Sequence, residues 1–197
     1  MFNKEMFDLY KDAKIPVYSV TNHLDIYPDA YLSNFKFYKK SHALMAIAGE
    51  CMNELESFKY RIKEGKPLYI SHGIDLGFTV AKDTGFFNFA IANYDESFYN
   101  TTVNINRAIY EAEHRDSLAC VGGDRLDIFY MSCIPSLSFD HLQNPLKGGD
   151  YDSIPVVIIG KIEDNKLPIC IQAHHGFVTA KHMSDFFNLY QEKLNDL

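Results

Sequence analysis

Two adjacent histidines near the C-terminal end of the chain are the residues best suited to chemistry. His174 and His175 directly follow an apolar segment, in the stretch Ile171-Gln172-Ala173-His174-His175-Gly176-Phe177-Val178. Consecutive residues of a β-strand point to opposite faces, so the two imidazoles should enter different surroundings and have different roles. Histidine side chains titrate near neutral pH, so a neutral imidazole can take a proton from a hydroxyl group and return it later. The pair is therefore a candidate for general acid–base catalysis.

The residue pattern leaves other interpretations of this pair open. Two structural histidines with satisfied hydrogen bonds would give the same sequence. Zinc ligation fits less well, because His182 does not lie at a spacing typical of a third ligand. A Cys-His nucleophile is disfavoured because no cysteine has an electropositive sequence context, and Cys170 lies inside the apolar segment. Nucleotide chemistry is disfavoured too, since Gly122-Gly123 is an ordinary turn and no glycine-rich loop precedes Lys-Ser/Thr.

The elements that position the histidines can be predicted from periodicity. Apolar residues recur at steps of three and four over residues 41–58, 95–114 and 183–194, which predicts three helices. Short segments rich in β-branched residues and bounded by turn formers predict strands at 68–71, 75–81, 127–133, 154–162 and 167–173. The compact polar residues between the last two predict an antiparallel hairpin. We expect one α+β domain over residues 1–197, with helices packed on a mixed, largely antiparallel sheet.

Composition excludes several classes of protein. The 197 residues are 47% hydrophobic and can bury one sizeable core, and the net charge of −7 without a Lys/Arg cluster disfavours nucleic acid as a partner. The apolar stretches are too short to cross a membrane, and the N-terminal residues 1–11 mix charge with aromatics, unlike a secretory signal. The sequence therefore predicts a cytoplasmic protein with no membrane partner. The scattered cysteines fit reduced thiols better than a disulfide framework; they are Cys51, Cys120, Cys133 and Cys170.

The C-terminal stretch IQAHHGFVTAKHMSDFFNLYQ is similar to the signature of chloramphenicol acetyltransferases, in which a strand enters H-H-x-x-x-D-G and continues into a helix. Further segments resemble motifs of that family in the same order along the chain. These are residues 35–38 (K-F-Y), 58–75 (F-R-x-A-I-K-x-G-x-L), 78–80 (F-T-V), 134–140 (P-W-V-S/N-F) and 154–161 (A-P-I-x-T-M-x-K). The resemblance covers nearly the whole chain.

The resemblance implies a fold, an assembly and a reaction. The fold would be that of coenzyme A-dependent acyltransferases, assembled as a homotrimer with active sites between subunits. His175 would act as general base and let a hydroxyl of a small molecule, such as chloramphenicol, attack acetyl-CoA without a metal, which is a reaction that gives antibiotic resistance. Lys36 and Lys161 would lie near the coenzyme A phosphates, and Tyr18 and Phe78 near the acceptor. Isolated lysines are otherwise usually solvated, and aromatics at strand ends often belong to the core.

Several positions differ from the family pattern. Thr179 and Ala180 stand where the signature has aspartate and glycine, and Lys4 stands where the family has the arginine that pairs with this aspartate. His141 occupies the position aligned with the oxyanion-stabilising serine, and Ile158 that of a threonine. Loss of an oxyanion donor typically lowers turnover ~10²- to 10³-fold, unless His141 donates instead. The sequence therefore leaves two alternatives: an active O-acetyltransferase, or a weakened or inactive relative that binds a small molecule or coenzyme A.

Overall fold

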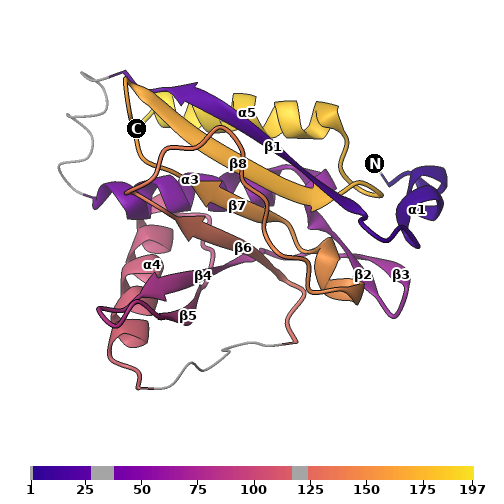
Figure 1. The fold of residues 1–197 in the computed structure, drawn as a ribbon, viewed down its shortest axis with the longest axis horizontal. Helices are drawn as coiled ribbons and strands as arrows, with labels where there is room; N and C mark the ends of the chain where they lie inside the picture. Colours follow the sequence, from indigo (N-terminus) through magenta and orange to yellow (C-terminus); the bar gives the residue numbers. More distant parts are fainter. Residues whose placement is uncertain (1, 28–37, 117–123) are drawn as a thin grey trace.

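Within the part of the chain that the structure describes, residues 2–27, 38–116 and 124–197, a six-stranded sheet forms the centre of the molecule (Figure 1). This computed structural model has the strand order β1-β8-β7-β6-β4-β5. The strand bounds are Val17–Asp25 (β1), Asp75–Ala81 (β4), Phe87–Ala92 (β5), Ile128–Cys133 (β6), Val156–Ile159 (β7) and Lys166–His174 (β8). A separate small sheet pairs β2 (Tyr60–Lys63) with β3 (Lys66–Tyr69).

The central sheet is mixed, as the sequence predicts. β8 pairs antiparallel with both β1 and β7, and β4 pairs antiparallel with β5. The pairs β4–β6 and β6–β7 are parallel. The predicted hairpin is confirmed: β7 and β8 are antiparallel neighbours, and Asp164 and Asn165 in the connection have positive φ angles of 49° and 59°. Asparagine and aspartate tolerate this left-handed conformation better than most residues.

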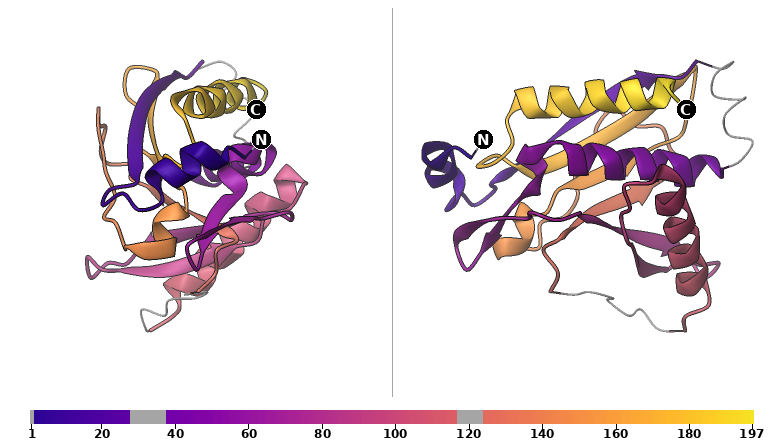
Figure 2. Two further views of the ribbon diagram at one scale, coloured as in Figure 1. Left: turned by 90° about the vertical axis from the view of Figure 1, so that its right-hand side faces the viewer. Right: turned by 180° about the vertical axis from the view of Figure 1, so that it is seen from behind.

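Helices cover one face of the sheet (Figures 1 and 2). Their bounds are Lys4–Tyr10 (α1), Lys40–Glu54 (α3), Phe98–Glu113 (α4) and Ala180–Asn195 (α5), with short 3₁₀ helices at Glu56–Lys59 (η1) and Gly149–Ser153 (η2). α3 contacts both α4 and α5. α1 lies beside the C-terminal end of β8 (Figure 1). None of the helices described is long and apolar enough to cross a membrane.

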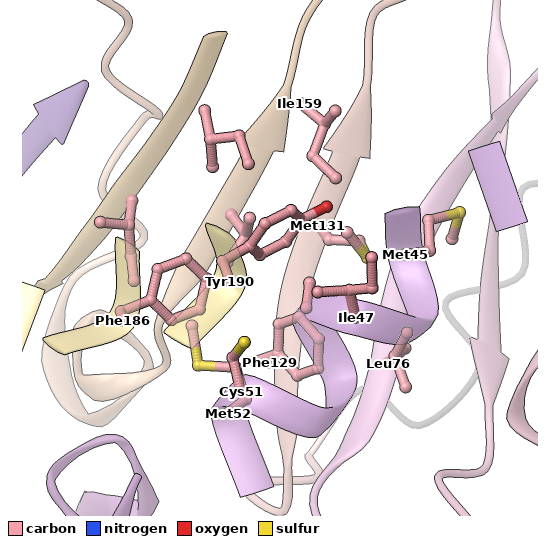
Figure 3. Close-up of a cluster of buried hydrophobic side chains, with 14 of the residues drawn as sticks. Met45, Ile47, Cys51, Met52, Leu76, Phe129, Met131, Ile159, Phe186 and Tyr190 are labelled. Carbon is pink, nitrogen blue, oxygen red and sulfur yellow. The ribbon is translucent and has the colours of Figure 1, made fainter. Parts of the chain in front are cut away.

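The core lies between α3, α5 and the sheet (Figure 3). Ile47 and Met52 of α3 and Phe186 of α5 are fully buried and pack near Phe129 of β6. Tyr190 of α5 is also fully buried, and its hydroxyl donates to the Leu44 carbonyl at 2.7 Å. A buried tyrosine hydroxyl usually needs such a partner, because an unpaired buried polar group costs free energy. α3 and α5 are therefore fixed to each other, and α5 in turn is fixed to the end of β8 that precedes it.

The opposite face of the sheet is crossed by residues 134–148, which connect β6 to η2 (Figure 1). The Cys170 thiol donates to the Leu142 carbonyl at 3.0 Å, and the Asn144 N–H donates to Gln172 Oε1 at 3.0 Å. Cys170 and Gln172 alternate along β8 with the apolar core residues Ile169 and Ile171. β8 therefore presents polar side chains to this second face and apolar ones to the helices.

Several element boundaries differ from the sequence predictions. β7 ends at Ile159 rather than at residue 162, because Lys161 N–H donates to the Leu137 carbonyl at 2.8 Å and leaves the ladder. α4 begins at Phe98 rather than at residue 95, since the Ser97 side chain caps it. Periodicity does not predict α1, β1, β2 or β5, because their segments mix polar and apolar residues without clear alternation.

Candidate active site

A tight turn joins β8 to α5 and presents the two histidines. The carbonyl of His174 accepts hydrogen bonds from the N–H groups of Phe177 and Val178, both at 3.0 Å. The His174 ring adds a third bond, because its Nδ1 accepts from the Gly176 N–H at 3.0 Å. The N–H of His175 donates to the Pro16 carbonyl at 2.7 Å, which ties the turn to the start of β1. Hydrogen bonds therefore fix the peptide group between His174 and His175 at both its carbonyl and its N–H.

The imidazole of His175 is half-buried and has a defined orientation. Its Nδ1 lies 3.0 Å from the Val178 carbonyl oxygen. A carbonyl only accepts, so Nδ1 carries the proton of the neutral ring and Nε2 keeps a lone pair. The ring centroid lies 4.3 Å from that of Tyr10 and 4.6 Å from that of Tyr18. The two tyrosines hold the ring between them, and the free lone pair can accept a proton from a hydroxyl group.

His174 lies in very different surroundings, as the alternation of a strand predicts. Its side chain is only 2% exposed, and its ring centroid lies 5.3 Å from that of Phe177. Burial lowers the pKa of His174 to about 4, although Asp152 acts in the opposite direction. Its Nε2 is buried and has no hydrogen-bond partner among the described residues. His174 is therefore neutral at physiological pH and has no open path to a reacting group.

The start of α5 is stabilised without the aspartate of the family signature. Thr179 stands in its place and caps the helix, and its N–H donates to His182 Nδ1 at 3.1 Å. Lys4, which was expected opposite this position, is exposed and forms an ion pair with Asp8 one turn along α1. A cap of this kind satisfies donors that the first turn of a helix leaves open. The loop after His175 is thus held by a helix cap rather than by an ion pair.

Tyr18 and Phe78, both predicted to lie near the acceptor, are in different environments. Tyr18 contacts His175, and its buried hydroxyl has no partner among the described residues. Burial, followed by the nearby Tyr10 hydroxyl, raises the pKa of Tyr18 to about 12. Phe78 is 4% exposed and belongs to the hydrophobic core. The structure thus brings Tyr18 to His175 and places Phe78 in the core of the subunit.

One of the two lysines predicted to bind coenzyme A lines a pocket at the start of α3. Lys161 borders this pocket of about 250 Å³ together with Lys40, whereas Lys36 lies outside the described residues. The floor is largely apolar and includes Leu44, Cys133, Pro135 and Ile159. Lys161 also pairs with Glu163 at 2.7 Å. Two ammonium groups beside an apolar floor suit a ligand with phosphates and a long, weakly polar arm.

His141 and Ile158, the two altered positions on the second face, differ in exposure. His141 is exposed in the segment that crosses this face, and Ile158 is 1% exposed in β7. Ile158 is paired in the ladder with Ser132 of β6, a half-buried residue whose hydroxyl the sequence analysis did not consider. Tyr10 is a second site residue that the sequence did not predict, since nothing in the local sequence connects Tyr10 to His175. Among the residues described, no group of His, Cys, Asp and Glu could hold a metal ion.

Proteins of similar sequence are named chloramphenicol acetyltransferases. The chain is 26% identical over 196 residues to chloramphenicol acetyltransferase 2 of Haemophilus influenzae, with 95% of this chain and 90% of that protein covered. It is 26% identical over 194 residues to a chloramphenicol acetyltransferase of Clostridium perfringens, with 96% and 89% covered. A solved chloramphenicol acetyltransferase structure superposes with a TM-score of 0.85 at 20% identity, covering 97% of this chain and 94% of that one, so the folds are the same. The family profile for chloramphenicol acetyltransferase matches residues 1–191, and the chain belongs to that family.

Proposed function

We propose that the protein is an O-acetyltransferase that moves an acetyl group from acetyl-CoA to a hydroxyl group of a small molecule, with chloramphenicol as the first acceptor to test. The family supports acetyl transfer, and the names of its relatives suggest this acceptor. The observation that carries the proposal is the bond between His175 Nδ1 and the Val178 carbonyl. It leaves the Nε2 lone pair of an oriented, half-buried imidazole available as the base.

The reaction proceeds in a ternary complex. Nε2 of His175 takes the proton of the acceptor hydroxyl as its oxygen attacks the thioester carbonyl of acetyl-CoA. The imidazolium that forms keeps its bond to the Val178 carbonyl, and its ring stays between Tyr10 and Tyr18. The tetrahedral intermediate then collapses, the C–S bond breaks, and His175 returns the proton to the departing sulfur. General base catalysis contributes ~10²- to 10⁴-fold, and correct placement of both substrates contributes much of the rest.

We place the phosphates of coenzyme A near Lys161, with Lys36 as a further contributor. The pocket that Lys161 shares with Lys40 opens between α3 and the end of β7. Its apolar floor suits the pantetheine arm, and its ammonium groups attract a multiply charged ligand. The acceptor would approach His175 from the side of Tyr18, whose buried hydroxyl offers a hydrogen-bonding group. Phe78 is buried in the core on β4 and would not contact the acceptor within this subunit.

The oxyanion of the tetrahedral intermediate requires a hydrogen-bond donor. His141 is one candidate, and its exposure in a single chain suits a group that acts across a subunit boundary. Ser132 is a second candidate. It is paired in the sheet with Ile158, which stands where the family has a threonine, so the Ser132 hydroxyl lies next to the position of the missing hydroxyl. Separate His141→Ala and Ser132→Ala variants distinguish the two, since loss of the true donor lowers kcat ~10²- to 10³-fold.

We propose that the enzyme works as a homotrimer with each site completed by a neighbouring copy. Leu9 and Ile15 flank Tyr10 in the sequence, yet they are 72% and 65% exposed. Apolar side chains with this exposure next to a catalytic histidine suit a surface that a second subunit covers. An inactive binding protein is the alternative function, favoured by the changes at Thr179 and Ile158. The intact cap at the start of α5 argues against it, because the His175 loop keeps a defined geometry.

Thiol release from acetyl-CoA tests the proposal. Purified protein is incubated with acetyl-CoA and a panel of hydroxyl-bearing acceptors that includes chloramphenicol, and free coenzyme A is titrated with a chromogenic thiol reagent. We expect acceptor-dependent turnover that falls ~10²- to 10⁴-fold in His175→Ala. Turnover that is absent with every acceptor, or equal in wild type and His175→Ala, would exclude the proposed reaction. Binding of coenzyme A without turnover would then favour the alternative.

A further inference from the structure

His174 organises the turn that carries the catalytic base. Three N–H groups of the turn, those of Gly176, Phe177 and Val178, donate to atoms of this one residue. The bonds to its carbonyl require only a backbone and are available to any amino acid. The bond from Gly176 requires an acceptor on the side chain, at the position of Nδ1. The third bond is therefore specific to the imidazole.

Gly176 and the His174 ring fit each other closely. A Cβ atom added to Gly176 would lie 2.9 Å from both Nδ1 and Cε1 of His174, and 3.4 Å from Cα of Phe7. Real Cβ atoms do not approach other atoms so closely, and the ring is only 2% exposed, so it has little room to move. The ring occupies the space that a side chain at position 176 would need. A glycine is required here by this contact, although its backbone angles do not require one.

The two histidines hold opposite tautomers, and Val178 connects them. Since the Gly176 N–H can only donate, Nδ1 of His174 carries no proton, and the proton of the neutral ring is on Nε2. Since the Val178 carbonyl can only accept, Nδ1 of His175 carries its proton. The same Val178 donates its N–H to the carbonyl of His174. His174 thus positions Val178, and Val178 in turn fixes the ring of His175.

On this geometry, and resting on the acetyl transfer proposed above, we infer that His174 is a positioning residue for the reaction. Its neutral ring holds the 174–178 turn in the form in which Val178 fixes the tautomer and direction of His175. It does not touch the substrates, because its side chain is buried. The charged and titratable groups that act on its ring are Asp152 of η2 and His175 itself. Without Nδ1 of His174 to accept the Gly176 N–H, the turn loosens. The Nε2 lone pair of His175 is then no longer held toward the hydroxyl group of the substrate.

Two substitutions of similar size separate this role from simple packing. In His174→Asn the amide oxygen lies where Nδ1 was and still accepts from Gly176, whereas in His174→Gln the polar group lies near the former Nε2. We expect His174→Asn to keep kcat within about threefold of wild type, and His174→Gln to lose ~10²-fold, the cost of a misplacement near 1 Å. The KM for acetyl-CoA should stay within about twofold in both, since its pocket is elsewhere. His42→Ala removes another buried histidine, on α3, and should leave kcat unchanged.

A double substitution tests the contact with Gly176. Gly176→Ala should lower kcat in the wild-type protein by displacing the His174 ring, yet add little in a His174→Ala background, where the space is free. Equal kcat losses for His174→Asn and His174→Gln, or equal effects of Gly176→Ala in both backgrounds, would overturn the inference. So would a kcat loss of similar size in His42→Ala.

Tautomers give a measurement that does not depend on activity. Among the ring signals of protein labelled with ¹⁵N-histidine, we expect one Nε2-protonated signal that disappears in His174→Gln and one Nδ1-protonated signal that disappears in His175→Ala. In His174→Gln the His175 signal should shift toward a mixture of tautomers, and in His174→Asn it should not. If no hydroxyl compound supports turnover but the tautomer signals behave in this way, the proposed reaction fails, whereas the control of the His175 ring by His174 stands. An unchanged His175 signal in His174→Gln overturns the inference even if the enzyme is active.

Discussion

His175 can act as a base because its other ring nitrogen is already engaged. The Val178 carbonyl binds Nδ1, and Tyr10 and Tyr18 lie within 4.6 Å of the ring, centroid to centroid. An oriented imidazole loses little entropy when it meets a substrate hydroxyl, so its full basicity is available for proton transfer. Neither tyrosine adjoins His175 in the sequence, so this arrangement depends on how α1 and β1 pack against the end of β8.

The buried Tyr18 hydroxyl leads to a prediction about stability and substrate binding. It has no partner among the described residues, and a buried polar group without a partner costs about 1 to 3 kcal/mol. Tyr18→Phe should therefore raise the free energy of unfolding by about 1 kcal/mol in urea titrations. If the acceptor satisfies this hydroxyl, the same change should raise the acceptor KM ~10-fold and leave the acetyl-CoA KM unchanged. A less stable Tyr18→Phe variant would contradict the assignment of an unsatisfied hydroxyl.

The lowered pKa of His174 leads to a second prediction, about how stability depends on pH. Burial lowers it to about 4, from an ordinary value near 6.5. Between these two pH values the unfolded chain binds a proton that the native protein does not, so the free energy of unfolding must fall as the pH falls. At pH 5 the loss relative to pH 7 is about 2 kcal/mol from this residue. Urea unfolding at pH 7 and pH 5 should show this loss in wild type and a smaller one in His174→Asn; equal losses would contradict it.

The candidate site could be predicted only where the sequence brings its parts together. His174 and His175 are adjacent and follow a recognisable strand, so their different environments follow from alternation alone. The partnership of His175 with Tyr10 joins residues 165 positions apart and leaves no local signal. The same holds for the cap of α5, because the sequence shows that Thr179 replaces an aspartate but not which hydrogen bond holds the loop instead. A missing carboxylate can be read from the sequence, but the bond that replaces it cannot.

At the scale of elements, the predictions succeeded where a segment has a single clear periodicity. The strand predicted at 75–81 matches β4, and the one at 167–173 lies within one residue of β8 at each end. β8 is buried along nearly its whole length and β4 at four of its seven residues, and such apolar segments give a strong signal. β1 contains Tyr18 but was missed, because most of its residues are only half-buried and polar ones are interspersed. Its role as a strand depends on pairing with β8 along its full length.

The cap of α5 leads to a prediction at this scale. Thr179 N–H donates to His182 Nδ1, and α5 begins directly after the turn of His175. His182→Ala removes the acceptor and should lower the free energy of unfolding by about 1 kcal/mol, as loss of a helix cap does. It should also lower kcat, because the end of the catalytic turn becomes less fixed. Lys4→Ala is the matched control, because its ion pair with Asp8 is exposed and screened by solvent and should contribute little to the free energy of unfolding. Equal effects of the two substitutions in urea unfolding would show that the cap does not hold the loop.

At the scale of the whole molecule, the two faces of the sheet have different functions. The helices bury the apolar face and give the subunit its stability. The second face carries polar side chains of β8 and is crossed by one segment of irregular backbone, residues 134–148, which contains His141. The turn that carries His175 lies where the last strand leaves this sheet, beside α1 (Figure 1). Most of the stabilising core is thus separate from the residues that would meet substrates or a second subunit.

The exposed residues around α1 lead to the last prediction, which concerns assembly. Ile15 is 65% exposed between α1 and β1, near the residues that contact His175, and we expect it to be covered in a homotrimer. A lysine there would place a charge in the buried interface, so Ile15→Lys should give monomers in analytical ultracentrifugation and lose turnover. Tyr110→Lys is the control, because Tyr110 is 61% exposed on α4, and this variant should remain trimeric and active. Monomeric Ile15→Lys with full turnover would show that one chain holds the complete site, and a monomeric wild type would exclude the trimer.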